Sequence, residues 1–351
     1  MWQSSKRTTG GQRLKSKVPE PLNIKKFHGL PHRLTSSGRL WLMRITVVFL
    51  FSTGCSDDGA YRLVDFSERL PTESSHAQEA DAIRLRVAVA AMVSPKETLS
   101  YYQALIDYLG EKLGREVQLI QRKTYGEVDA LFLKGQIDLG FICSGPYASG
   151  KDRYGFEALV TPVIRGKPFY QSYLIVNRDA SFKDLEALRG HRFAFSDPES
   201  NSGALVPQYW LARMKERPET FFKSITYTYS HDNSIMGVAR SLFDGAAVDG
   251  HKWEYYSVKE SPYISKTRVI RKSDPIGSPP LVASKFMSRQ SKDAIREIFS
   301  SMHMDPEGKK ILKGLLIDRF VATDESWYDP VRMMTGVVRG PEQAAHVSKE
   351  S

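Results

Sequence analysis

A short polar segment at residues 200–203, with the sequence SNSG, is the clearest candidate for chemistry in this chain. It lies between a strand-like segment and a helix-like one, so the first N–H groups of that helix have no acceptors within it. Those groups and the hydroxyls of Ser200 and Ser202 could bind an anion, which a helix N-terminus favours by about 0.3–1 kcal/mol. A serine that only caps the helix would satisfy the same pattern. The spacing alone leaves both interpretations open.

Two tyrosines and a histidine stand at the starts of other predicted elements. Tyr125 begins a predicted helix, Tyr170 a predicted strand, and His231 another helix. Each could donate a hydrogen bond to a ligand oxygen from its phenol or imidazole. Each also has a structural interpretation, because the phenols could point into water and His231 could cap its helix together with Asp232. Residue type and position do not decide between the two.

Asp249 and His251 stand close together at the end of a short predicted strand. A carboxylate beside an imidazole could carry out acid–base catalysis. No Gly-x-Ser-x-Gly motif and no complete P-loop accompanies them, and two cysteines are too few for a cysteine-rich metal site. The sequence therefore predicts no enzyme, no cofactor and no metal, and it leaves Asp249 and His251 as candidate ligand-binding residues.

The elements that would position these residues alternate between strand and helix patterns from about residue 83. Strand-like segments lie at 83–90, 117–123, 137–142, 156–163, 170–179, 191–197, 225–230 and 246–250. Helix-like segments lie at 97–114, 125–136, 181–190, 203–214, 231–245, 292–303 and 305–316. This alternation predicts an α/β protein with helix-covered sheets. Extended segments near 173–178 and 273–280 are expected to join two lobes, with a wide cleft between them in the absence of ligand.

The net charge of +10 is unevenly distributed along the 351 residues. Residues 1–55 hold ten Lys and Arg against one Glu, so nine of the ten net positive charges lie there. The rest of the chain, residues 56–351, is nearly neutral, and this gives no support to nucleic acid as a partner. With 41% hydrophobic residues, that body can form a sizeable core.

The basic segment continues into a short apolar run at 45–51 and small residues before Cys55, as in a bacterial lipoprotein signal. Ser52 departs from that pattern, which usually has a leucine-like residue three positions before the cysteine. Lipidation of Cys55 is predicted, with simple secretion or a retained anchor as alternatives. Cys143 would then have no partner for a disulfide. The predicted segments are a leader at 1–55, a tether at 56–82, a first lobe at 83–175 and 276–335, a second lobe at 176–275, and a polar tail at 336–351.

Four motifs in order, KTYGEVDAL, GKPFYQSYLIVNRD, DPESNSGALVP and YSHDNSIMGV, resemble the PhnD-like substrate-binding proteins of phosphate, phosphite and phosphonate ABC importers. The resemblance spans about residues 83–327 and implies a two-lobed type II periplasmic binding protein fold. It implies that the oxyanion is held by Ser200, Asn201 and Ser202, and is surrounded by Tyr125, Tyr170 and His231. Where family members that bind aminoalkylphosphonates have acidic residues, this chain has His251 and Ser278. Asp249, nearby in sequence, could compensate in part.

The predicted function is therefore capture of a small phosphorus oxyanion, such as phosphate, phosphite or a simple phosphonate, outside the cytoplasm. A sulfonate is also a possible ligand on the sequence alone, because its geometry and charge are similar. The expected partner is an ABC permease in the membrane, reached by a monomeric, lipid-anchored protein. One alternative is a sensor of the same fold that signals to a membrane histidine kinase. The other is an enzyme that uses Asp249 with His251.

Overall fold

The structure, a computed structural model, describes residues 84–90 and 95–347. All of these belong to the larger of the two units into which the chain divides, Arg69–Ser351. The predicted lipidation site Cys55 lies outside the described residues, as do the predicted leader and tether. Within the described part, no helix is both long and apolar enough to cross a membrane.

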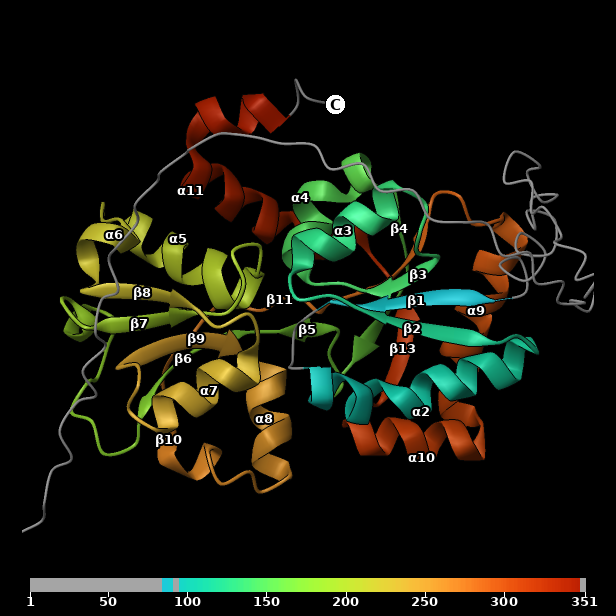
Figure 1. The fold of residues 1–351 in the computed structure, drawn as a ribbon, viewed down its shortest axis with the longest axis horizontal. Coiled ribbons are helices and arrows are strands. Elements are labelled where there is room, and N and C mark those ends of the chain that lie inside the picture. The colour runs from blue at the N-terminus through green and yellow to red at the C-terminus, as the bar shows by residue number, and fades with distance from the viewer. Residues whose placement is uncertain (1–83, 91–94, 348–351) are drawn as a thin grey trace, which may run out of the picture. The chain divides into compact units, whose positions relative to one another are not determined.

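Six strands form the first sheet, in the order β13-β4-β12-β3-β1-β2 (Figure 1). Their bounds are β1 (Leu85–Val89), β2 (Val117–Gln121), β3 (Leu139–Phe141), β4 (Phe156–Val163), β12 (Leu281–Ser284) and β13 (Arg319–Ala322). Strand β1 runs parallel to β2 and β3, whereas β12 and β13 run antiparallel to their neighbours. Late segments of the chain thus complete a sheet that the early segments begin.

Helices cover both faces of this sheet because its strands bury side chains on both sides. The helices are α2 (Pro95–Leu113), α3 (Tyr125–Leu133), α4 (Ser144–Tyr154), α9 (Arg289–Ser301) and α10 (Pro306–Leu315). Leu85, Val87 and Val89 of β1 belong to a buried cluster with residues of α2, α9 and α10. Ala88, which points the other way, belongs to a second cluster with residues of α3 and α4. The predicted helix-covered sheet is present.

Five strands form the second sheet, in the order β10-β6-β9-β7-β8. Their bounds are β6 (Ser172–Asn177), β7 (Arg192–Phe195), β8 (Ser224–Tyr227), β9 (Gly245–Asp249) and β10 (Thr267–Lys272). The helices beside it are α5 (Val206–Arg213), α6 (Pro218–Phe221), α7 (His231–Ala239) and α8 (Gly250–Val258). Strands β7, β8 and β9 are parallel, so their carboxyl ends share one edge of the sheet. In parallel α/β sheets this edge is where ligands bind.

Two short strands link the sheets, β5 (Phe169–Tyr170) and β11 (Ile276–Gly277), which pair antiparallel with Tyr170 opposite Ile276. The second crossover lies where the sequence predicted it, within 273–280. The prediction of the first at 173–178 is wrong, because those residues pair with β9 and β10 inside the second sheet. The crossover precedes Ser172 instead, and the expected lobe boundary after residue 175 falls inside β6.

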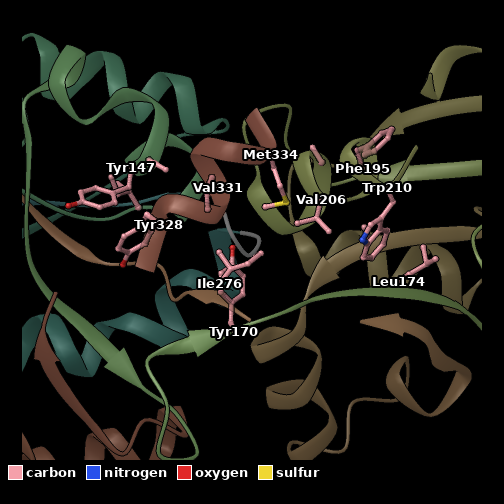
Figure 2. Close-up of a cluster of buried hydrophobic side chains, with 14 of the residues drawn as sticks. Tyr147, Tyr170, Leu174, Phe195, Val206, Trp210, Ile276, Tyr328, Val331 and Met334 are labelled. Atoms are coloured by element: carbon pink, nitrogen blue, oxygen red, sulfur yellow. The ribbon is translucent and has the colours of Figure 1, made fainter. Parts of the chain in front are cut away.

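A last helix, α11 (Asp329–Val347), connects the two sheets through packing. Its residues Val331 and Met334 belong to a buried cluster that also holds Tyr328 and, beside the second sheet, Val206 and Trp210. Figure 2 shows Val331 and Met334 between the two groups. This helix was not predicted, and it extends through much of the segment expected to be a polar tail.

Other differences from the predicted elements have local causes. The helix expected at 181–190 is only a short 3-10 turn, Glu186–Leu188, because Gly190 with φ of 73° ends it and so short a segment nucleates poorly. The helix expected from residue 203 begins earlier, as a π-helical turn over Asn201–Leu205 that leads into α5. Helix α8 and strand β13 were also not predicted.

Candidate functional site

The SNSG segment lies at the carboxyl end of β7, and Ser200, Asn201 and Ser202 are all buried. The hydroxyl oxygen of Ser200 accepts the N–H of Gly203 at 3.0 Å, so Ser200 is the helix cap. Gly203 is required by its surroundings, because a Cβ there would lie 2.4 Å from Oγ of Ser196. The cap interpretation thus holds for Ser200 and does not extend to Ser202.

Several buried side-chain oxygens, in this segment and at other positions that the sequence analysis named or next to them, have no hydrogen-bond partner among the described residues. They are Oγ of Ser202, Oδ1 of Asn201, the phenol oxygen of Tyr125, Oγ of Ser230 and Oγ of Ser278. An unsatisfied buried polar group typically costs about 1–3 kcal/mol. Such groups therefore call for a functional explanation, and a polar ligand is the simplest one.

Tyr170 comes to this segment from the crossover strand β5. Its phenol oxygen accepts a hydrogen bond from Nδ2 of Asn201 at 2.8 Å. Burial raises the pKa of Tyr170 well above its ordinary value, so the phenol keeps its proton. A neutral phenol that already accepts one hydrogen bond still has its own O–H to donate.

Tyr125, the first residue of α3, comes from the first sheet and is likewise buried. Its backbone N–H donates to Oδ2 of Asp197 at 3.2 Å, which ties α3 to the loop before residue 200. Burial, with smaller contributions from the Cys143 thiol and from Asp197, raises the pKa of the Tyr125 phenol well above its ordinary value. The phenol is therefore another neutral donor.

His231 begins α7 at the carboxyl end of β8. Its Nδ1 lies 2.8 Å from Oγ of Ser196 and accepts the backbone N–H of Asp249 at 3.2 Å. A backbone N–H can only donate, so Nδ1 carries no proton and the proton of the neutral ring is on Nε2. Burial lowers the pKa of His231 to about 4, which keeps the ring neutral at neutral pH. His231 thus contributes an N–H donor and no charge.

Asp249 and His251 lie where β9 passes into α8. One carboxylate oxygen of Asp249 accepts the N–H of Lys252 at 3.2 Å and so caps α8. The ring of His251 lies 5.9 Å from that of Tyr170, measured between centroids. Burial lowers the pKa of His251. The structure therefore brings both residues to the site, with Asp249 in a helix-capping role and His251 beside Tyr170.

The predicted residues thus converge from separate elements, and the two sides of the site touch. Besides the Tyr125–Asp197 and Asn201–Tyr170 hydrogen bonds, α4 comes close to the same loop, since a Cβ on Gly145 would lie 2.4 Å from the carbonyl oxygen of Glu199. The structure shows these contacts where the sequence predicted a wide cleft. Local sequence patterns hold no information about the separation of two lobes.

Three further residues of the site were missed by sequence reasoning. Ser196 contacts His231, Ser230 has an unpartnered hydroxyl at the start of α7, and Lys252 is a buried lysine in the first turn of α8. Ser230 could have been found, because it directly precedes His231 in a predicted strand-to-helix junction. Nothing in the sequence indicated Lys252 as a residue of the site, because helix α8 itself was not predicted.

Comparison with known proteins gives consistent matches. Residues 87–328 match the family described as "ABC transporter, phosphonate, periplasmic substrate-binding protein". The phosphonates-binding periplasmic protein of Escherichia coli K12 is 25% identical over 265 residues, which are 74% of this chain and 78% of that protein. A binding protein component of an ABC phosphonate transporter from Pseudomonas aeruginosa aligns with a TM-score of 0.69 and 24% identity, over 76% of this chain and 93% of that one. PhnD1 from Prochlorococcus marinus MIT 9301, solved in complex with methylphosphonate, aligns with a TM-score of 0.65 and 18% identity, over 72% of this chain and 97% of that one.

Proposed function

Because the chain belongs to the family of periplasmic substrate-binding proteins of ABC phosphonate transporters, we propose that it captures a small phosphorus oxyanion for an ABC permease. The proposed ligands are phosphate, phosphite and simple phosphonates. The family is one of transport proteins, and its structures share the two-lobed type II fold that the sequence predicted. The role proposed for this chain is therefore binding and delivery, without covalent chemistry.

The observation that best supports this proposal is the unpartnered hydroxyl of Ser202 at a helix N-terminus, surrounded by neutral donors. The phenols of Tyr125 and Tyr170 and the Nε2–H of His231 are uncharged at neutral pH. An oxyanion needs several donors, and hydrogen bonds to a charged acceptor are worth about 1.5–3 kcal/mol each. This set of groups supplies them without a buried, unpaired cation.

Asn201 adds a means of discrimination among oxyanions. Its Oδ1 is buried and has no donor among the described residues. A phosphorus oxyanion that retains one proton can donate to this oxygen, whereas a sulfonate has no proton at neutral pH. We therefore propose phosphorus over sulfur as the ligand's central atom.

Calorimetric titration of the purified protein with phosphate, phosphite, methylphosphonate and methanesulfonate tests the proposal. At least one phosphorus oxyanion should bind, and methanesulfonate should bind at least tenfold more weakly. Mass spectrometry of ligand carried through native purification would identify the natural compound directly. Failure of all three phosphorus compounds to bind, or preferential binding of methanesulfonate, would contradict the proposal.

A further inference from the structure

Two carboxyls with buried oxygens lie where helix α3 packs against the loop that follows β7. Asp129 belongs to α3, which covers the first sheet, and it is 1% exposed. Glu199 belongs to the loop after β7 of the second sheet. A Cβ on Gly126 would lie 3.2 Å from Oε2 of Glu199, and Asp129 shares a face of α3 with Gly126 because it follows three positions later. The two carboxyls therefore approach this packing contact from the two lobes.

One oxygen of each carboxyl has no hydrogen-bond partner among the described residues. These buried atoms are Oδ2 of Asp129 and Oε2 of Glu199. A buried carboxylate that is neither paired nor hydrogen-bonded is costly, and two close together favour a state in which one keeps a proton. Burial, followed by the charges of Glu199 and Asp197, raises the pKa of Asp129 to about 8. In this arrangement Asp129 is therefore mostly protonated at neutral pH.

The other ionisable groups around this packing contact do not remove the need for that proton. Asp197, in the same loop, adds a negative charge that acts on both carboxyls. Arg153 of α4 and Arg339 of α11 lower the pKa of Glu199, but burial and the charge of Asp197 outweigh them, so this pKa is raised. Burial also raises the pKa of the nearby Tyr154 phenol of α4, which therefore stays neutral.

The same two segments carry the proposed oxyanion site. Helix α3 begins with Tyr125, and the loop continues directly into residues 200–202. The backbone N–H of Tyr125 donates to Oδ2 of Asp197 at 3.2 Å, so the two segments touch beside the site. An oxyanion held between Tyr125 and Ser202 would keep α3 against the loop, and opening of the hinge would separate them. Ligand binding and burial of the two carboxyls are therefore expected to be coupled.

We propose that closure of the lobes on a ligand takes up one proton, which is held between Asp129 and Glu199. The inference rests on the proposed function, because it assumes that an oxyanion at residues 200–202 closes the lobes. In the open form both carboxyls are expected to face water and to ionise near pH 4. The closed form keeps a proton to higher pH, so its stabilisation is fully present below about pH 4. Affinity should then fall as the pH rises toward 8.

Calorimetric titration with methylphosphonate at pH 5.5, 6.5 and 7.5 tests this inference on wild-type protein and Asp129→Asn. The ligand and other side chains also ionise in this range, but their contributions are common to both proteins and cancel in the comparison. Between pH 5.5 and 7.5, wild-type affinity should fall at least about tenfold more than that of Asp129→Asn, whose amide never ionises. Parallel pH profiles of the two proteins would overturn the inference.

The proton itself can be counted by repeating the titration at pH 6.5 in Bis-Tris and in imidazole, which differ in their enthalpy of ionisation. Wild-type protein should take up about half a proton or more per ligand beyond the number for Asp129→Asn. Glu199→Gln removes the second carboxyl and should also lower the count. Asp152→Asn, at an exposed aspartate of α4, is the matched control and should keep the wild-type count. Equal counts in all four proteins would overturn the inference.

The outcomes also distinguish this inference from the proposed function. If wild-type protein binds methylphosphonate with the same pH profile and proton count as Asp129→Asn, the proposed function stands and the inference fails. If wild-type protein binds no phosphorus oxyanion at any of the three pH values, both fail. Should Asp129→Asn not fold, the comparison of wild type with Glu199→Gln still decides.

Discussion

At the scale of single residues, Ser200 and Ser202 stand two positions apart in one turn and differ in their hydrogen bonds. Ser200 accepts the N–H of Gly203 and so satisfies the helix end. Ser202 is as deeply buried, yet its hydroxyl has no partner among the described residues. Of the two alternatives that the sequence left open, the structure shows the cap at Ser200, and we propose the anion-binding role for Ser202.

Substitution of each serine by alanine should separate the two roles. Ser200→Ala should lower the free energy of unfolding by roughly 0.5–2 kcal/mol, because a helix cap is lost. Ser202→Ala should leave that free energy nearly unchanged and weaken methylphosphonate binding by roughly tenfold to a hundredfold, the equivalent of one charge-assisted hydrogen bond. Thermal or urea unfolding without ligand and calorimetric titration measure the two effects.

Each variant is the control for the other, because both remove one hydroxyl from the same turn. The assignment is wrong if Ser202→Ala binds methylphosphonate as wild type does while its unfolding free energy falls. In that case Ser202 would belong to the helix cap, and the best-supported residue of the proposed site would be lost.

At the scale of elements, helix α3 brings both a residue of the proposed site, Tyr125, and a buried carboxyl, that of Asp129, close to the loop before residue 200. A capping box fixes its start: Oγ1 of Thr124 accepts the N–H of Glu127 at 3.2 Å, and Oε2 of Glu127 accepts the N–H of Thr124 at 3.1 Å. Tyr125 follows directly, and Asp129 lies about one turn further on. A Cβ on Gly126 would lie 3.2 Å from Oε2 of Glu199, so α3 packs closely against the loop before residue 200.

The carboxyls at this contact should make stability depend on pH. Burial, with the nearby charges of Glu199 and Asp197, raises the pKa of Asp129 to about 8, against roughly 4 in an unfolded chain. Between these values the folded protein holds one more proton than the unfolded chain. The free energy of unfolding is therefore highest below about pH 4, where the carboxyl is protonated in both states. It falls as the pH rises toward 8, by up to about 1.4 kcal/mol per pH unit. Urea unfolding at pH 5.5, 7.0 and 8.5 measures this slope.

The variant Asp129→Asn should flatten the slope and should be more stable than wild type at pH 8.5, because its amide never ionises. Asp152→Asn, at an exposed aspartate of α4, is the control and should keep the wild-type slope. Glu199 also contributes to the pH dependence of stability, since burial and the charge of Asp197 raise the pKa of its carboxyl. Identical slopes in wild type and Asp129→Asn would show that Asp129 is ionised throughout.

At the scale of the whole described unit, two connections govern how the sheets can move apart. The paired strands β5 and β11 join them covalently, and helix α11 joins them by packing. Met334 of α11 is 6% exposed and belongs to the same buried cluster as Val206 of α5, which Figure 2 shows beside it. Hinged opening about β5 and β11 would have to loosen this contact.

Ligand should close the protein, and Met334 should favour the closed form. Small-angle scattering should show a smaller radius of gyration with saturating methylphosphonate than without it. Met334→Ala removes buried contacts from a type of site where Met→Ala typically costs about 2–5 kcal/mol. If part of this packing energy stabilises the closed form, Met334→Ala should bind methylphosphonate roughly tenfold more weakly, which corresponds to about 1.4 kcal/mol. The effect would arise although Met334 itself is not expected to touch the ligand.

Met333→Ala is a matched control, because Met333 is adjacent in sequence and 52% exposed. It should bind as wild type does and show the same radii. An unchanged radius of the wild-type protein at saturation would argue against hinge closure. Equal effects of the two methionine variants on binding would argue against a role for the contact of α11 with α5.

Membrane attachment is a further prediction at this scale, and it concerns a residue outside the described part of the chain. We propose that Cys55 becomes a lipid-carrying N-terminus, because small residues precede it and a polar segment follows. Metabolic labelling with a fatty acid should mark the protein, and Cys55→Ser should abolish the label. Label that persists in Cys55→Ser would rule out this residue as the attachment point.

The sequence determined those features of this protein that depend on neighbouring residues. The apolar alternation of Leu85–Val89, the run Phe156–Val163 and the start of α3 at Tyr125 are local patterns, and the strands and helix occur there. The SNSG segment marked a helix start for the same reason. The resemblance of the sequence to a known family extended this to a fold and a list of site residues. Among them, Tyr170 contacts Asn201, and His231 contacts Ser196 and Asp249.

Only the tertiary structure decided which of those groups have hydrogen-bond partners and which have none among the described residues. Whether a hydroxyl such as that of Ser202 has a partner depends on residues far away in sequence. The first crossover at β5, the burial of Lys252 in α8, and the effect of the Glu199 charge on Asp129 likewise arise from the packing of distant segments. Local propensity carries no information about such pairings, because they are fixed by the register of the sheets and the packing between them.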